Sequence, residues 1–302
     1  MKKMNTLIVD GNNLLHRTFW VASMKHNKSI VSPIYLFLIS LKKLVKDLSA
    51  DDIIITWDHK LIKDQVNYRR LLCVDYKGNR DRTGRDDMYK QEKHIRDIVE
   101  TLGVRNILPG VLEADDIIYW LCKKVVGNKI IASADSDLHQ LIDSNTSVYD
   151  FNKKLEITPS NFKDVTGYES VDEYMQIKSL VGDKSDNISG LPRVGVKTAR
   201  KILSDGISTL TEEQKEIYNR NTKLINLSTG LDVHPDEIPL YESQFNKTNK
   251  GCISTFKTAC TKFNMPKISN KLVEWEEVFF NTTIENAAAS CIHTLFKTDG
   301  NT

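Results

Sequence analysis

The sequence predicts an α/β protein with a parallel-sheet core and a mainly helical lobe behind it. Short apolar runs of strand type alternate with helical stretches up to about Thr158-Pro159. Beyond that point helical periodicity prevails. Strands that alternate with helices favour a parallel sheet with right-handed crossovers. We therefore expect an α/β domain over residues 1–159 and a helical lobe over residues 160–302.

The individual elements follow from apolar periodicity and from turn residues. The expected strands cover residues 6–9, 53–57, 104–108 and 130–132. The expected helices cover residues 33–48, 94–102, 171–181, 196–203, 212–227 and 251–263. A further helix is expected from the apolar run that begins at Ile117.

Three of the expected strands lead directly into acidic residues. Asp10 follows the first strand, Asp58 the second, and Asp135 and Asp137 follow the strand that ends near Ala132. The carboxyl ends of parallel strands meet at one edge of a sheet. We therefore expect these four carboxylates to lie close together, although a single aspartate after a strand is also a common turn residue.

A second acidic group stands in the segment LEADDIIYWL, residues 112–121. Glu113, Asp115 and Asp116 precede the apolar stripe that contains Ile117 and Ile118. Acids in the first turn of a helix can simply cap free N–H groups and suit the helix dipole. The alternative is that they join the acids of the strand ends, where the shared negative charge would require cations. Oxygen ligands without histidine or cysteine predict Mg²⁺ or Mn²⁺.

Composition narrows the class of protein. The chain has 302 residues, of which 40% are hydrophobic, enough for a full core. Its five scattered cysteines include no C-x-x-C pair, which argues against a disulfide framework and a zinc site. The beginning MKKMNTLIVDGNN lacks the apolar region of a signal peptide, and no apolar run could span a bilayer. We expect a cytoplasmic protein without membrane contact.

The net charge is only +2, but basic residues gather in two places, over residues 60–105 and 193–201. Basic patches on both sides of clustered acids are expected of a metal-dependent enzyme that acts on a polyanion. Ordinary solvated helix faces would also produce such patches.

The segment Tyr76 to Gln91, YKGNRDRTGRDDMYKQ, is highly charged and has little apolar periodicity. We interpret it as a loop or partly helical lid above the acidic edge that contributes nothing to the core. Lys77 and Arg80 are then nearest the sheet and best placed to meet a phosphate. An ordinary exposed loop is the alternative.

A further motif, LVGDKSDNISGLPRVGVKTARKIL, covers residues 180–203. Asp183 and Asp186 add two carboxylates, and the glycines at 190 and 195 bracket a turn into a basic helix. Such a hairpin can present backbone N–H groups to a nucleic-acid phosphate, with lysines beside it. An ordinary helix connection would have a similar pattern.

These motifs, in this order, resemble the structure-specific 5′ nucleases. That family includes the 5′-nuclease domain of bacterial DNA polymerase I, the stand-alone phage 5′ exonucleases and, more distantly, the flap endonucleases. The resemblance rests on IVDGNN, YKGNR, EADD, SADSDL and GDKSDN followed by GLPRVGVKTA, and it covers about Leu7 to Leu203. It implies a PIN-like nuclease core with a DNA-binding lobe of helix-hairpin-helix type near residues 180–203.

The resemblance also implies roles for individual residues. Two or more Mg²⁺ ions, or Mn²⁺ in their place, would lie among Asp10, Asp58, Glu113, Asp115, Asp116, Asp135, Asp137, Asp183 and Asp186. Lys77 and Arg80 match the basic residues under the helical arch of the family, which would correspond to residues 77–93 here. The hairpin residues that would bind DNA are Gly190, Arg193, Gly195, Lys197, Thr198 and Lys201, with K⁺ as a candidate ion completing the phosphate site.

The expected activity is metal-dependent hydrolysis of DNA near 5′ flaps, nicks or ends, with RNA–DNA hybrids as further substrates. Such an enzyme would remove flaps or RNA primers during replication in a bacterial or phage-infected cell, and we expect a monomer. Leu295-Phe296 could dock on a sliding clamp or a single-strand-binding protein, or pack against the chain's own core. Two other readings are a junction binder of the same fold without activity and a phosphatase of haloacid-dehalogenase type. Phosphatases of that type have a second aspartate two residues after the first, and this chain has Asn12 at that position.

Overall fold

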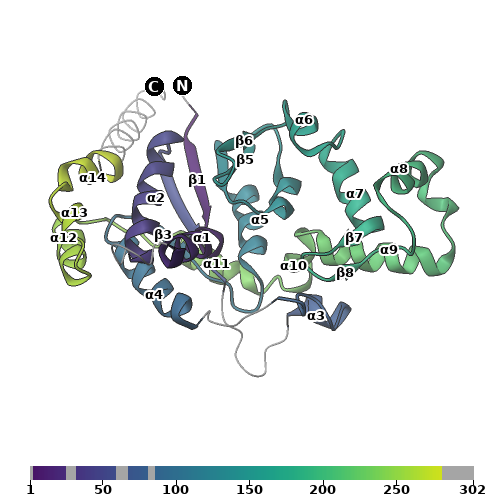
Figure 1. Cartoon of the computed structure of the whole chain (residues 1–302), viewed down its shortest axis with the longest axis horizontal. Coiled ribbons are helices and arrows are strands. Elements are labelled where there is room, and N and C mark those ends of the chain that lie inside the picture. The colour runs from purple at the N-terminus through teal and green to yellow at the C-terminus, as the bar shows by residue number, and fades with distance from the viewer. Residues whose placement is uncertain (1–2, 25–31, 59–66, 81–85, 281–302) are drawn as a thin grey trace, which may run out of the picture.

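A six-stranded sheet forms the centre of the computed structural model, which describes residues 3–24, 32–58, 67–80 and 86–280 (Figure 1). In chain order its strands are β1 (Asn5–Asp10), β2 (Asp52–Thr56), β3 (Arg105–Ile107), β4 (Asn128–Ala132), β5 (Thr146–Asp150) and β6 (Leu155–Ile157). The spatial order is β3-β2-β1-β4-β5-β6. All neighbouring strands are parallel except β6, which runs antiparallel to β5. The predicted α/β class with a parallel sheet is confirmed.

The strand order reverses at β1. The chain passes from β1 to β2 and β3 on one side, and then crosses to β4 and β5 on the other. Ligands of open α/β sheets bind outside the carboxyl ends of the strands at such a switch point. Here the switch point lies between the end of β1 at Asp10 and the end of β4 at Ala132.

Helices cover both faces of the sheet. The elements between the strands are α1 (Gly11–Met24), α2 (Pro33–Asp47), α3 (Tyr68–Leu72), α4 (Asp86–Glu100), α5 (Ala114–Lys124) and the 3₁₀ helix η1 (Ser136–Leu141). Successive residues of β1 point to opposite faces: Leu7 and Val9 belong to one buried cluster and Ile8 to another. Burial on both faces explains why the strands are continuous apolar runs rather than alternating ones.

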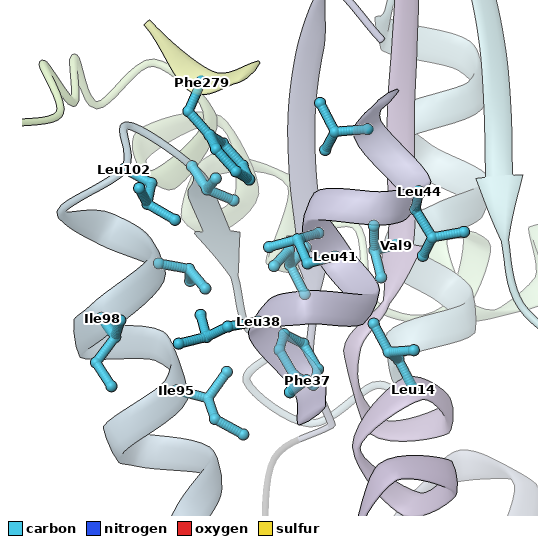
Figure 2. Close-up of a cluster of buried hydrophobic side chains, with 14 of the residues drawn as sticks. Val9, Leu14, Phe37, Leu38, Leu41, Leu44, Ile95, Ile98, Leu102 and Phe279 are labelled. Carbon is cyan, nitrogen blue, oxygen red and sulfur yellow. The ribbon is translucent and has the colours of Figure 1, made fainter. Parts of the chain in front are cut away.

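The cluster on the first face is organised by α2 (Figure 2). Phe37, Leu38 and Leu41 of α2 lie between Val9 of β1 and the apolar side of α4. Phe37 also stacks on Trp57, with ring centroids 5.6 Å apart. Each such side chain contributes about 1.5–3 kcal/mol when fully buried. This packing fixes the start of α1 and the end of β2, from which two of the acids project.

The helical lobe extends away from the sheet (Figure 1). It comprises α6 (Phe162–Thr166), α7 (Val171–Val181), β7 (Gly182–Asp183), β8 (Ile188–Ser189), α8 (Val196–Asp205), the 3₁₀ turn η2 (Ile207–Thr209) and α9 (Glu212–Ile225). It has a small core of its own, made of Ile177, Leu180, Leu191, Ala199 and Leu210. The short antiparallel pair β7–β8 connects the end of α7 to the turn before α8.

The helical lobe was expected over residues 160–302, but the described helices that follow α9 do not pack within it. The last described helices, α10 (Ser228–Val233), α11 (Glu237–Phe245), α12 (Ile253–Lys262), α13 (Pro266–Ser269) and α14 (Leu272–Phe279), return to the α/β core. Trp120 of α5 packs against Tyr241 and Phe245 of α11. On the other face Phe256 and Trp275 join the cluster around α2. Of these helices the sequence predicted only the one over residues 251–263, and its apolar spacing does not say which surface it covers. Residues 281–302, which include Leu295-Phe296, lie outside the described part.

The prediction that Tyr76 to Gln91 contributes nothing to the core is wrong at two positions. Tyr76 and Met88 are only 3% and 4% exposed. Because α4 begins at Asp86, the last part of the expected arch is a regular helix whose apolar side contacts α2, while residues 81–85 lie outside the described part. The many charges on the outer side of α4 concealed its buried stripe. Within the described ranges, the structure contains no helix that is long and apolar enough to cross a membrane.

Candidate active site

The first acids of the site are held at the carboxyl edge of the sheet by neighbouring polar groups. Asp10 accepts hydrogen bonds from the Asn13 backbone N–H at 3.0 Å and from Ser133 Oγ at 2.8 Å. Ser133 directly follows β4, so this bond joins the two strands of the switch point. Its hydroxyl oxygen also accepts from the Asp135 backbone N–H at 3.0 Å, which fixes the next acid of the edge.

The carboxylates of Asp58 and Asp135 are held in the same way, by backbone N–H groups. Asp58 accepts from the Ala114 backbone N–H at the start of α5, at 2.8 Å, and its own N–H donates to Asn12 Oδ1. The Asp137 backbone N–H donates to Asp135 Oδ1 at 2.9 Å. The acidic residues at the strand ends are therefore fixed by the starts of neighbouring helices and by the strand that follows the switch point. The positioning roles of Asn12, Asn13 and Ser133 were not predicted from the sequence, although the first two residues lie in the IVDGNN motif.

The three acids at the start of α5 have three different environments. Glu113, the N-cap residue, accepts from Tyr76 Oη at 3.0 Å and from Lys77 Nζ at 2.8 Å. Asp116 points into the protein and is fully buried, with both oxygens held by Arg69. Asp115 lies between them and lines a small cavity together with Glu113.

Asp116 therefore differs from the other predicted ligands. Arg69 Nη1 and Nη2 donate to its two oxygens at 2.8 and 2.7 Å, and the Glu113 backbone N–H donates to Oδ2 at 3.0 Å. Its carboxylate lone pairs are already engaged in a bidentate, charge-assisted pair. Asp116 therefore caps the start of α5, as the first interpretation of the acidic segment predicts, and does not face the other acids.

Two acids of the helical lobe reach the same cavity. Asp183 ends β7, and Asp186 follows in the turn to β8. Both line the cavity, together with Glu113, Asp115 and Asp137 of the core. Five of the nine predicted acids thus meet where the lobe joins the sheet. The remaining lining residues are Arg69, Tyr76, Ile188, Leu227 and the last two residues of α9, Leu224 and Ile225.

Lysine side chains bridge the acids of the core and the lobe. Lys77 Nζ lies 2.8 Å from Glu113 Oε2 and 3.8 Å from Asp186 Oδ2. Lys178, in the last turn of α7, contacts Asp137 Oδ1 and lies 2.6 Å from Asp183 Oδ2. Arg80 Nη2 adds a contact of 2.6 Å with Asp186. Lys178 was not predicted from the sequence. The only signal was a basic residue on the helix that runs into Gly182-Asp183.

Burial and crowding shift the ionisation of the acids. Burial, reinforced by Asp58 and Asp135 against two hydrogen bonds, raises the pKa of Asp10 to about 7. Burial first and the Asp135 charge second raise the pKa of Asp115 well above its usual value. Burial also raises the pKa of Asp137, although Lys178 opposes this. These carboxyls are therefore harder to ionise than exposed ones, and a cation placed among them would favour their charged forms.

The pKa values of Glu113 and Asp183 shift in the opposite direction. Burial opposes the ionisation of Glu113, but Lys77 and Arg69 prevail and lower its pKa to about 2. Burial likewise opposes the ionisation of Asp183, but Lys178 lowers the pKa of that carboxyl to about 2. Asp186 differs, because burial outweighs Lys77 and Arg80 and raises its pKa.

In the described part of the chain, no three acidic, histidine or cysteine side chains converge closely enough to hold a metal ion in their present positions. The lysine contacts give a physical reason, because ammonium groups occupy the space between the carboxylates. The donor set itself suits a hard divalent cation, since it consists of carboxylates without thiolate or imidazole ligands.

The predicted hairpin residues separate into two groups. Gly190 is needed inside the fold, because a Cβ there would overlap the Val181 carbonyl group at the end of α7. Gly195, the N-cap of α8, has nothing within 4 Å of its Cβ position and is exposed. Arg193, Lys197, Thr198 and Lys201 are exposed around it. Arg193 has a left-handed backbone conformation with φ 61°, which tightens the turn.

A doubly wound sheet with acids along its carboxyl edge, next to a helical lobe with an exposed glycine turn, is an α/β fold of the kind that binds its ligands at the carboxyl ends of the strands. Residues 5–167, more than half of the chain, match the family described as 5′-3′ exonuclease, N-terminal resolvase-like domain. The chain is 33% identical to a 5′-3′ exonuclease of Mycoplasmopsis pulmonis over 68% of its own length and 67% of the relative's. It therefore belongs to the 5′-3′ exonuclease family.

Other relatives agree with this assignment. A 5′-3′ exonuclease of Buchnera aphidicola is 31% identical over 75% of this chain and 77% of its own. DNA polymerase I of Bacillus subtilis is 29% identical over 74% of this chain, which spans only 26% of the polymerase.

Solved structures agree on the fold. The bacteriophage T5 D15 flap endonuclease, in a complex with DNA and metal ions, has a TM-score of 0.58 at 23% identity, with 90% of this chain and 99% of that chain covered. Flap endonuclease-1 from Methanococcus jannaschii has a TM-score of 0.58 at 13% identity, with 92% and 94% covered. The expected nuclease fold is confirmed.

Proposed function

We propose that the protein is a divalent-metal-dependent, structure-specific 5′ nuclease that hydrolyses phosphodiester bonds near 5′ flaps, nicks or ends of DNA. The observation that carries the proposal is the convergence of carboxylates from the sheet edge and from the helical lobe on one cavity beside Lys77 and Arg80. A solved relative, the T5 D15 flap endonuclease, was crystallised with DNA and metal ions, which supports both cofactor and substrate class.

Mg²⁺ is the proposed cofactor, with two or more ions and with Mn²⁺ able to replace it. The proposed ligands are Asp10, Asp58, Glu113, Asp115, Asp135, Asp137, Asp183 and Asp186. The raised pKa values of Asp10 and Asp115 support this, because an unbalanced buried carboxylate gains most from a cation. Bound there, the ions would supply an activated water molecule and stabilise charge on the phosphoryl group. We assign Asp116 a positioning role instead, because Arg69 holds both of its oxygens.

Lys77 and Arg80 orient the substrate in this proposal. Lys77 has a left-handed backbone conformation, φ 52°, and its N–H donates to the Asp186 carbonyl oxygen at 2.9 Å. This hydrogen bond fixes the Lys77 backbone between the α/β core and the helical lobe. The Lys77 ammonium and the Arg80 guanidinium can then leave their carboxylate partners and donate charge-assisted hydrogen bonds to a scissile phosphate. Their positive charge would also oppose the build-up of negative charge during hydrolysis.

The turn before α8 is the proposed grip on duplex DNA. The backbone N–H groups at the start of α8, near the exposed Gly195, have no side-chain cap. A phosphate can approach them closely, with Lys197, Thr198, Lys201 and Arg193 around it and K⁺ as a candidate bridging ion. Gly190 does not belong to this contact surface, because its role is to let β8 approach α7. Because the turn before α8 lies at a fixed distance from the acids, binding of the duplex there would restrict cleavage to phosphodiester bonds near a junction.

RNA–DNA hybrids, including primers, are proposed as further substrates, since backbone contacts carry no information about the base sequence. The protein is also proposed to be a monomer. Docking on a sliding clamp or a single-strand-binding protein is proposed for Leu295-Phe296, which lies outside the described residues.

A labelled 5′-flap substrate tests the proposal. We expect short 5′ fragments to be released in Mg²⁺ and not in EDTA, whereas a blunt duplex of the same sequence should be cut far more slowly. A shifted but uncut band in Mg²⁺ would instead identify a junction-binding protein. Release of inorganic phosphate alone would identify a phosphatase.

A further inference from the structure

Two lysines of the site have equivalent positions. Each places its ammonium between one acid of the α/β core and one acid of the helical lobe: Lys77 between Glu113 and Asp186, and Lys178 between Asp137 and Asp183. The proposed function gives Lys77 a task at the phosphate but assigns none to Lys178.

Lys178 is held firmly in this position. It stands in the last turn of α7, its side chain is only 12% exposed, and its ammonium lies 5.4 Å from the centre of the Tyr174 ring. Among the described residues, it is the only cationic group in an ion pair with either Asp137 or Asp183. The ammonium thus lies where a cation that bridges the core to the lobe would have to bind.

The two carboxylates need a positive charge between them. Asp137 and Asp183 are both largely buried, and two ionised carboxylates held so close would repel each other strongly without one. A divalent ion and an ammonium cannot occupy the same space between them. Binding of the ion must therefore move the ammonium away.

We propose that Lys178 is a tethered counter-ion that holds the Asp137–Asp183 pair together in the metal-free protein and is exchanged for a divalent cation. The proposal rests on the proposed function for the identity of that cation. It makes Lys178 a positioning residue that assembles the core and the lobe before the ion arrives. It also lowers the affinity of this ion, because each binding event must first break two ion pairs.

The test is the variant Lys178→Met, which keeps the apolar stem and removes the charge. Mn²⁺ binding is measured by titration with detection of the free ion, and thermal unfolding is measured in EDTA and in excess Mg²⁺. We expect the variant to bind an Mn²⁺ ion about tenfold more tightly than the unaltered protein. We also expect it to unfold at a lower temperature in EDTA and to recover in Mg²⁺. Adding Asp183→Asn should abolish the gain in affinity, which locates the ion.

Lys163→Met is the matched control, since Lys163 pairs with Glu169 at 2.9 Å on the exposed surface. It should leave metal affinity and the Mg²⁺ dependence of unfolding unchanged. The proposal is overturned if Lys178→Met has unaltered Mn²⁺ affinity, or if it stays unfolded or destabilised in excess Mg²⁺, because Lys178 would then be a structural ion pair. Neither Mn²⁺ affinity nor thermal unfolding involves cleavage. A protein that does not cut the flap substrate can therefore still confirm the role of Lys178, and a protein that cuts it can still contradict that role.

Discussion

Arg69 and Asp116 form a bidentate ion pair in the interior, with exposures of 1% and 0% and N–O distances of 2.8 and 2.7 Å. Arg69 Nε also donates to the Leu224 carbonyl oxygen at the end of α9, at 3.2 Å. The pair thus connects α3, the start of α5 and the helix that returns from the lobe. Its position beneath Glu113 explains how an acid within the EADD motif can serve the site without facing it.

Removing one partner of this pair should be costly. Arg69→Met leaves a buried carboxylate without a counter-charge, so we expect the free energy of unfolding to fall by about 3–5 kcal/mol. Urea unfolding at neutral pH measures this. Lys43→Met, which removes an exposed pair with Asp47, is the control and should leave the free energy of unfolding almost unchanged. Equal losses in the two variants would show that the buried pair has no special role.

Asp115→Asn and Asp135→Asn should each abolish cleavage of a 5′-flap substrate in Mg²⁺ while leaving its binding nearly intact. The reason is that each substitution removes a proposed ion ligand and leaves the proposed DNA contacts in place. Single-turnover rates and gel-shift affinities separate the two effects. Asp172→Asn, an exposed acid in the first turn of α7, is the control. Turnover near the unaltered rate by either site variant would refute the ligand assignment.

Glu92 on α4 should make stability depend on pH. Burial, opposed by Arg96 and aided by Asp58, raises its pKa from 4.5 to about 7. The folded state then binds more protons than the unfolded state between these values, so this residue's contribution to stability declines as pH rises from about 4.5 to 7. Glu92→Gln should therefore be more stable than the unaltered protein at pH 8, by up to about 3 kcal/mol, with the difference vanishing near pH 4.

Urea unfolding in EDTA at several pH values measures this effect. Glu100→Gln, an exposed position at the end of the same helix, is the control and should show no such trend. A constant difference between Glu92→Gln and the unaltered protein across the pH range would contradict the assignment.

Lys197→Ala should weaken binding to duplex-containing substrates. If Lys197 contacts a phosphate, its loss should also reduce the slope of log affinity against log salt concentration by about one. Fluorescence anisotropy over a range of KCl concentrations gives both values. Lys267→Ala on α13, far from the lobe, is the control (Figure 1). An unchanged salt slope would remove the start of α8 from the contact surface.

The two hairpin glycines should respond differently to alanine. Gly190→Ala forces a Cβ against the Val181 carbonyl group, so we expect it to destabilise the fold by about 1–3 kcal/mol. Gly195→Ala meets no neighbouring atom and should leave stability nearly unchanged while weakening DNA binding. Thermal unfolding and anisotropy, measured on both variants, distinguish packing from contact with the ligand. Similar unfolding temperatures for the two variants would contradict this division.

Much of the α/β core could be predicted because its signals are local. Buried strands such as β1 and β4 are continuous apolar runs, and α7 was predicted with the bounds that it has, Val171–Val181. The short strands β5 and β6 were missed, since Thr146–Asp150 and Leu155–Ile157 mix polar and apolar residues at the edge of the sheet. The destination of α12 and α14 could not be predicted either, because an apolar helix face does not specify its partner.

The sequence by itself determined the strand-helix alternation, the acids at the strand ends and the motifs of the family, because each depends on residues close together in the chain. Only the tertiary structure decided the partner of each acid. Asp116 turned inward because Arg69, 47 residues earlier, reaches it in the interior, while Lys178 joins Asp137 to Asp183 across the two lobes. Those pairings depend on how α3, α7 and α9 pack against the sheet, and packing between distant segments leaves no periodic signal in the sequence.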